Sequence, residues 1–166
     1  ALELIGSTQI QGRASLGGNL CNGSPAADSV PALIVNNAIC RIASPNGNRD
    51  VKVEHFTKGP GKTALRKDEM LISLFLPNRP IKSSSAYLRL IPRTEMDIAV
   101  VGAAASLTLD EKDKCLAARI SLGAVAPRAI LVKGAEESLL GKEINEEVLV
   151  DLMFACEKAC NPINGT

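Results

Sequence analysis

A short run near the start of the chain, Ala14 to Asp28, combines glycines with polar side chains. Glycine lets the backbone approach a ligand closely and adopt positive φ, so such a run can expose backbone N–H groups to an anion. Asn19, Asn22 and Ser24 add side-chain donors and acceptors within the same span. The combination suits a ligand that carries phosphates and hydroxyls, such as a nucleotide cofactor.

The same run resembles the second flavin-binding segment of the FAD-binding (medium) subunits of molybdenum hydroxylases, the family of carbon monoxide dehydrogenase and xanthine dehydrogenase. The family pattern is Ser/Thr-Leu/Ile-Gly-Gly-Asn followed by Ser/Asp-Pro-x-x-Asp. This chain has Ser15-Leu16-Gly17-Gly18-Asn19 and Ser24-Pro25-Ala26-Ala27-Asp28 at matching spacing. Further blocks extend the resemblance over nearly the whole chain: 59–63, 70–77, 96–99 and 122–127.

The resemblance implies an α+β fold in two parts. Residues 1–83 are expected to form the second half of an FAD-binding domain, a partial vanillyl-alcohol-oxidase-like subdomain. Residues 84–166 are expected to form a small antiparallel sheet with helices, the carbon monoxide dehydrogenase flavoprotein C-terminal domain. Family members also carry an earlier glycine-rich pyrophosphate loop, and nothing before Ala14 resembles it. We therefore expect a fragment that lacks the N-terminal half of the flavin domain.

The resemblance also implies a cofactor and partners. FAD is expected here, with the molybdenum cofactor on a large subunit and [2Fe–2S] clusters on a small subunit. Electrons would pass from the clusters through FAD to an acceptor, so no residue of this chain is expected to be catalytic. The flavin-binding positions implied by the resemblance are Ala14, Ser15, Gly17, Gly18, Asn19, Cys21, Asn22, Ser24, Asp28, Leu71 and Arg89.

Two of these positions lie outside the glycine-rich run. In the family, the strand that matches Met70-Leu71 contacts the isoalloxazine ring, which favours Leu71, although a plain core role fits it equally well. A lysine two residues after an aromatic often lies near the ring, and the matching position here is Arg89, after Tyr87. Arginine keeps the positive charge but presents a planar fork, so it does not simply replace lysine. Arg93, Glu95 and Asp97 are expected to brace the next loop.

Composition excludes several other classes of function. The 166 residues carry a formal net charge of +1, only 2% are aromatic, and there is no tryptophan. Nucleic-acid binding is therefore disfavoured, because it usually needs a basic stripe and aromatic side chains for stacking. No apolar stretch approaches the ~20 residues that span a bilayer.

The cysteines and the single histidine suggest no catalytic or metal centre. The five cysteines form no C-x-x-C pair, and their odd, irregular count fits a reducing compartment, so we expect a cytoplasmic protein. His55 is the only candidate base for triad chemistry and lies in a predicted turn. The segment Gly59–Thr63 ends like a phosphate-binding P-loop, but Phe56 occupies the position where that motif needs its first glycine.

Periodicity and turn signals place the elements that must position the site. Residues 9–28 are predicted to be irregular loop, and Asn46-Gly47 is a strong hairpin signal between two extended segments. A linker is predicted at 78–85, where prolines and serines cluster. Helices are predicted at 1–5, 31–36, 135–140 and 146–160, and strands at 38–43, 50–53, 70–76, 86–91, 98–109 and 117–125.

Two alternatives remain open from the sequence. One is a flavin-dependent oxidase of the related fold that works without molybdenum. The other is a non-catalytic module whose second half docks onto partner subunits, which is compatible with the first interpretation. Metal analysis of the native complex separates the molybdenum enzyme from the oxidase.

Overall fold

The computed structural model describes residues 1–93 and 96–163. The helices, in chain order, are η1 (Leu2–Leu4, a 3-10 turn), α1 (Thr8–Gln11), α2 (Leu16–Cys21), α3 (Ser29–Val35), η2 (Val53–His55, also 3-10), α4 (Ala135–Leu139) and α5 (Glu146–Ala159). The strands are β1 (Ile39–Ser44), β2 (Gly47–Lys52), β3 (Thr57–Gly59), β4 (Lys62–Thr63), β5 (Met70–Phe75), β6 (Ser83–Leu90), β7 (Val101–Leu109), β8 (Cys115–Gly123) and β9 (Ile130–Leu131).

The first part of the chain forms a three-stranded sheet of order β2-β1-β5 and a small β3-β4 hairpin. β1 and β2 pair antiparallel with Ser44 opposite Gly47, so the turn lies where the Asn46-Gly47 signal predicted it. Gly47 adopts φ 119°, a conformation that glycine reaches without steric cost. The predicted hairpin is confirmed.

The glycine-rich run is not the irregular loop that the sequence predicted. Residues 16–21 form α2, and residues 8–11 form the short helix α1. Two features outweigh the low helix propensity of two adjacent glycines: Ser15 caps the helix, and Leu20 is fully buried in the core. The prediction of loop over 9–28 was therefore wrong for both helices.

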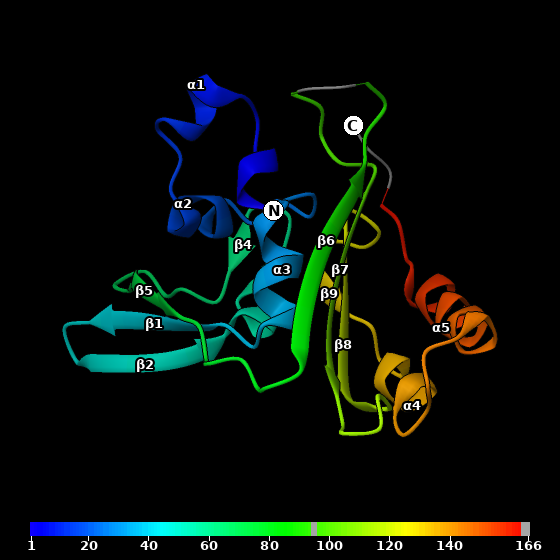
Figure 1. The fold of residues 1–166 in the computed structure, drawn as a ribbon. Coiled ribbons are helices and arrows are strands. Elements are labelled where there is room, and N and C mark those ends of the chain that lie inside the picture. The colour runs from blue at the N-terminus through cyan, green and yellow to red at the C-terminus, as the bar shows by residue number, and fades with distance from the viewer. Residues whose placement is uncertain (94–95, 164–166) are drawn as a thin grey trace.

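Helix α3 lies between the two sheets (Figure 1). It begins at Ser29, two residues before the predicted start, because Pro31 occupies an early helical position where its missing N–H costs nothing. Val30 and Ile34 are almost fully buried and join the central cluster with Cys40 and Ile42 of β1. This core fixes the first sheet against the helix.

The second part is a four-stranded antiparallel sheet of order β6-β7-β8-β9. Ala103 and Ala105 of β7 pack with Ile120, Leu122 and the apolar face of α5. The opposite face lies against α3, so helices cover both sides of this sheet (Figure 1). The small residues of β7 allow this close packing on both faces. The mixed α+β architecture with antiparallel sheets agrees with the prediction.

The C-terminal helices follow their local signals. Asn145 accepts a hydrogen bond from the amide of Val148 at 3.0 Å and caps α5, which begins at Glu146, the start that the sequence predicted. Gly141 adopts φ 73° after α4, as expected for a residue that ends a helix. In the predicted linker, by contrast, β6 already begins at Ser83.

The outer face of the second part carries exposed apolar side chains. On β6, Leu88 is 76% exposed, and on α5, Phe154 is 66% exposed. Over the ranges 1–93 and 96–163, no helix has the length and apolar character needed to cross a membrane.

Candidate functional site

The first turn of α2 uses part of its own backbone. The amide of Gly18 donates to Ser15 Oγ at 3.0 Å, and the amide of Asn19 donates to the Ser15 carbonyl at 2.9 Å. Within the described residues, the amides of Leu16 and Gly17 have no hydrogen-bond partner. The run therefore offers two backbone donors at its exposed start rather than a continuous row.

The two glycines of α2 serve different local needs. A Cβ on Gly18 would lie 2.9 Å from Ser15 Oγ, so this glycine makes room for the helix cap. A Cβ on Gly17 would lie 3.7 Å from Leu71 Cδ2, which is ordinary contact. Leu71 of β5 therefore lies beside the start of α2, and the structure brings these two predicted site residues together.

Some of the remaining polar residues of the run make hydrogen bonds within the protein, and others are exposed to solvent. Asn19 Oδ1 accepts a hydrogen bond from Ser29 Oγ at 2.5 Å, which ties α2 to α3. Ser24 Oγ accepts from the amide of Ala26 at 3.3 Å in a turn. The side chain of Asn22 is exposed, as are Ala14 and Ser15 before the helix. These exposed groups remain available to a ligand.

Cys21 is half-buried beside the central core. Burial raises the pKa of its thiol, which keeps it protonated at neutral pH. Cys21 therefore presents a neutral, weakly polar surface rather than a reactive thiolate.

The β3-β4 hairpin closes one side of the run. Gly23 adopts φ 65°, and its carbonyl accepts from the amide of Gly61 at 3.2 Å. A Cβ on Gly23 would lie 3.1 Å from the amide nitrogen of Lys62, so only glycine fits here without displacement. The P-loop-like segment is thus a tight turn packed on the glycine-rich run.

Asp28 is buried, with 7% of its surface exposed, and it is held from β6. Its Oδ1 accepts from the Tyr87 hydroxyl at 2.7 Å, and its Oδ2 accepts from Arg89 Nη1 at 2.9 Å. Residues two apart on a strand point to the same face, which places both donors toward α3. The structure thus joins the predicted residues Asp28 and Arg89 into an ion pair and adds Tyr87, which the sequence reasoning did not select.

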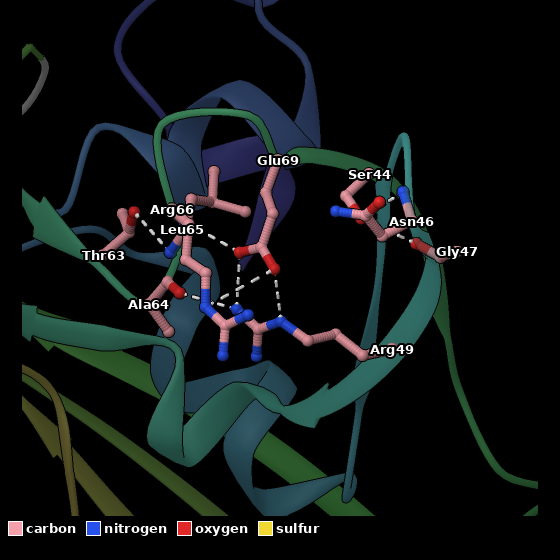
Figure 2. A network of polar contacts seen from close by, with 9 residues as sticks. All are labelled: Ser44, Asn46, Gly47, Arg49, Thr63, Ala64, Leu65, Arg66 and Glu69. Carbon is pink, nitrogen blue, oxygen red and sulfur yellow. Dashed lines mark hydrogen bonds and ion pairs between the residues drawn. The ribbon is translucent and has the colours of Figure 1, made fainter.

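A second network fixes the segment that leads into Leu71 (Figure 2). The Glu69 carboxylate accepts from Arg49 Nε and Nη2, each at 2.7 Å, and from the amide of Arg66 at 2.8 Å. Arg49 also donates to the Ala64 carbonyl at 2.7 Å. These bonds, above all those from Arg49, lower the pKa of Glu69 to about 2. Sequence reasoning missed this brace, since its two charged residues lie far apart in the chain.

The loop before β7 is braced as predicted. Asp97 accepts from the backbone amide of Arg93 at 2.8 Å and from Arg93 Nε at 2.9 Å. Glu95 lies outside the described residues. His55 is exposed, and its Nε2 lies 3.5 Å from Glu54 Oε1.

Two arginines of the second part hold the first part in place. Arg119 Nη2 donates to Glu54 Oε2 at 2.6 Å and to the carbonyl of Ile34 at 3.1 Å. Arg128 Nη1 donates to the Glu54 carbonyl at 2.7 Å. Arginines of the second part therefore hold α3 at both ends, Arg89 through Asp28 and Arg119 through the Ile34 carbonyl.

Comparison with known proteins identifies the class of protein to which this fold belongs. Residues 1–79 match the family described as FAD binding domain in molybdopterin dehydrogenase, and residues 86–166 match the CO dehydrogenase flavoprotein C-terminal domain. The chain belongs to the family of FAD-binding subunits of molybdenum hydroxylases.

Individual relatives support this membership. The chain is 35% identical over 150 residues to the xanthine dehydrogenase FAD-binding subunit of Escherichia coli O157:H7, covering 90% of this chain and 51% of that protein. It is 30% identical over 152 residues to the nicotinate dehydrogenase FAD-subunit of Eubacterium barkeri, with shares of 90% and 51%. The chain thus spans about half the length of these relatives.

The same fold occurs in a solved structure of carbon monoxide dehydrogenase from Hydrogenophaga pseudoflava, a form that lacks the Mo-pyranopterin moiety of its cofactor. The two superpose with a TM-score of 0.92 at 29% sequence identity, covering 98% of this chain and 56% of that one.

Proposed function

We propose that this chain holds FAD in the flavoprotein subunit of a molybdenum hydroxylase complex. The single observation that carries the proposal is the match of residues 1–79 to an FAD-binding family, over the segment where Gly17 and Leu71 come together. The residues that would hold the flavin are Ala14, Ser15, Gly17, Gly18, Asn19, Cys21, Asn22, Ser24, Asp28, Leu71 and Arg89.

The groups present fit this cofactor. FAD combines a polar pyrophosphate and ribityl chain with a largely apolar ring system. The start of α2 offers amides at Leu16 and Gly17 and the exposed side chain of Asn22, while Leu71 presents an apolar surface beside Gly17. When bound, FAD supplies electron-transfer chemistry that amino-acid side chains lack. This chain's part is to bind the cofactor, orient it and set the charge around it.

The rest of the complex follows from the family. A large subunit would carry the molybdenum cofactor and oxidise the substrate, and a small subunit would carry two [2Fe–2S] clusters. Electrons would pass from those clusters to FAD and then to an acceptor. The five free cysteines favour a reducing compartment, and we place the complex in the cytoplasm.

We also propose that residues 1–83 and 84–166 are distinct domains. The two family matches meet between residues 79 and 86, which supports this division. A docking role for the second domain is compatible with the flavin assignment, and the exposed apolar side chains of β6 and α5 favour it.

Two measurements on the full-length protein, purified with its accompanying subunits, test the proposal. A visible absorption spectrum should show bound flavin, and metal analysis should find molybdenum and iron. Flavin without molybdenum or iron would instead identify the oxidase alternative, and the absence of flavin would refute the assignment. Within the site, Asp28→Ala should weaken FAD binding; an unchanged flavin content and affinity would remove Asp28 from the site.

A further inference from the structure

The hydroxyl of Tyr87 donates its hydrogen bond to the buried carboxylate of Asp28. It donates to Asp28 Oδ1 at 2.7 Å, across the boundary between the two proposed domains. Burial, reinforced by the bond to Asp28, raises the pKa of Tyr87 well above its ordinary value, so the phenol remains a donor at every physiological pH. The side chain therefore acts on the carboxylate as a permanent neutral donor.

The Tyr87 ring occupies space that a side chain at position 102 would need. Gly102 of β7 lies across from Arg89 in the sheet, and a Cβ there would lie 2.6 Å from the Tyr87 hydroxyl oxygen. Real Cβ atoms essentially never approach that closely, and two ring carbons of Tyr87 would lie at 3.2 and 3.3 Å, so the ring would have to move. The φ of Gly102 is not positive, so glycine is required here for the space it leaves rather than for its backbone conformation.

The resulting cluster is compact and nearly sealed. The side chains of Asp28 and Arg89 are 9% and 8% exposed, so neither can rotate freely into water. A carboxylate offers about four acceptor positions on its two oxygens, and Tyr87 and Arg89 use two of them. A ligand hydroxyl that reached the remaining positions would therefore meet a carboxylate held in the orientation that its two protein donors impose.

We infer that Tyr87 is a positioning residue of the flavin site. Its hydroxyl fixes the rotamer of Asp28, so that Asp28 and Arg89 present a single immobilised ion pair to the cofactor, and Gly102 is the position that admits the ring. This inference rests on the proposed function, because the ligand of the pair is the flavin. It adds two positions, 87 and 102, to a site whose other members precede residue 90.

Five forms of the full-length protein test the inference: wild type, Tyr87→Phe, Gly102→Ala, the double variant and a matched control. The measurement is the Kd for FAD of the folded apoprotein, well below its unfolding temperature. Tyr87→Phe should weaken binding about tenfold, since hydrogen bonds to charged groups contribute on this scale. Gly102→Ala should produce a similar loss by displacing the ring. Ser83→Ala, which removes a hydroxyl elsewhere on β6, is the matched control and should bind FAD like wild type.

The double variant shows whether the two positions act through one contact. If Gly102→Ala acts by moving the Tyr87 hydroxyl, its effect should largely vanish once that hydroxyl is gone, giving a non-additive cycle. A purely structural role would lower the thermal midpoint of the apoprotein and leave the FAD Kd unchanged. That result in Tyr87→Phe overturns the inference while leaving the proposed function intact. A wild-type protein that binds no FAD overturns both.

Discussion

Glu69 and Arg49 lie twenty positions apart in the sequence and form a two-pronged pair, with both oxygens of the carboxylate held by the guanidinium at 2.7 Å. The pair joins β2 to the turn that precedes β5 (Figure 2). Arg66 closes the same turn by donating its amide to Glu69. The segment that leads into Leu71 is therefore held by an arginine from the strand at the opposite edge of the sheet.

This pair predicts a pH-dependent contribution to stability. The pKa of Glu69 falls from an ordinary 4.5 to about 2 in the folded state. The stabilisation is thus complete above pH 4.5 and is lost as the pH falls toward 2, because the unfolded chain takes up the proton first. Urea unfolding of wild type and Glu69→Gln should differ most at neutral pH and converge near pH 2. A difference that stays constant between pH 5 and pH 2 would contradict this assignment.

Arg119 is expected to contribute more to stability than an exposed arginine in a similar ion pair. Its side chain is 23% exposed and holds both Glu54 and the end of α3. Arg119→Met should lower the free energy of unfolding by about 2 kcal/mol, measured by urea denaturation. The control is Arg41→Met, which breaks a solvent-exposed pair with Asp50 and should cost clearly less. Equal losses in both variants would show that Arg119 does not brace the two parts.

Gly123 should resist substitution for reasons of space. A Cβ there would lie 3.0 Å from Pro31 Cγ and 3.5 Å from the Pro25 carbonyl oxygen, where β8 meets the start of α3. Gly123→Ala should destabilise the protein by about 1–3 kcal/mol through overpacking. Gly59→Ala is the matched control, since a Cβ on Gly59 would meet no atom within 4 Å, and its effect should stay near about 0.5 kcal/mol. A thermal or urea unfolding series measures both.

Gly17 offers a way to separate ligand approach from protein packing. Its Cβ would make only ordinary contact with Leu71, so Gly17→Ala should raise stability by about 0.5 kcal/mol, as alanine does within a helix. If the flavin approaches this backbone, the same methyl group should weaken FAD binding at least about tenfold.

The neighbouring glycine provides the contrast for that experiment. A Cβ on Gly18 would meet Ser15 Oγ at 2.9 Å, so Gly18→Ala should lose about 1 kcal/mol of stability with the cap. Unfolding curves and FAD titrations of both variants check the pair. Unchanged FAD affinity in a stable Gly17→Ala protein would show that the cofactor does not approach α2 there.

The features that the sequence predicted correctly are governed by near neighbours. Asn46-Gly47 specifies its own turn, and Asn145 caps a helix that starts at the next residue. The glycine-rich run failed the same reasoning because its conformation depends on the burial of Leu20, a tertiary effect that outweighs glycine's low helix propensity. Local signals therefore identified most of the longer elements, but not α1, α2 or the short strands β3, β4 and β9.

The site was harder to predict, because its bonds link distant residues. Tyr87 is 59 positions from Asp28, and Glu54 is 65 positions from Arg119. No spacing rule connects such pairs, although the alternation of Tyr87 and Arg89 along one strand was a signal that both face the same way. Family resemblance supplied the candidate flavin contacts, and their contact with the cofactor stays a prediction.

The ties across the boundary also bear on how such chains can diverge. Asp28 and Glu54 lie in residues 1–83, and the arginines that donate to them lie in residues 84–166. Gly102 leaves the space that the Tyr87 ring occupies on the same sheet. A recombinant that joined residues 1–83 to a second half without Arg89 or Arg119 would leave Asp28 or Glu54 without its cationic donor. We therefore expect substitutions at these positions to co-vary across the family.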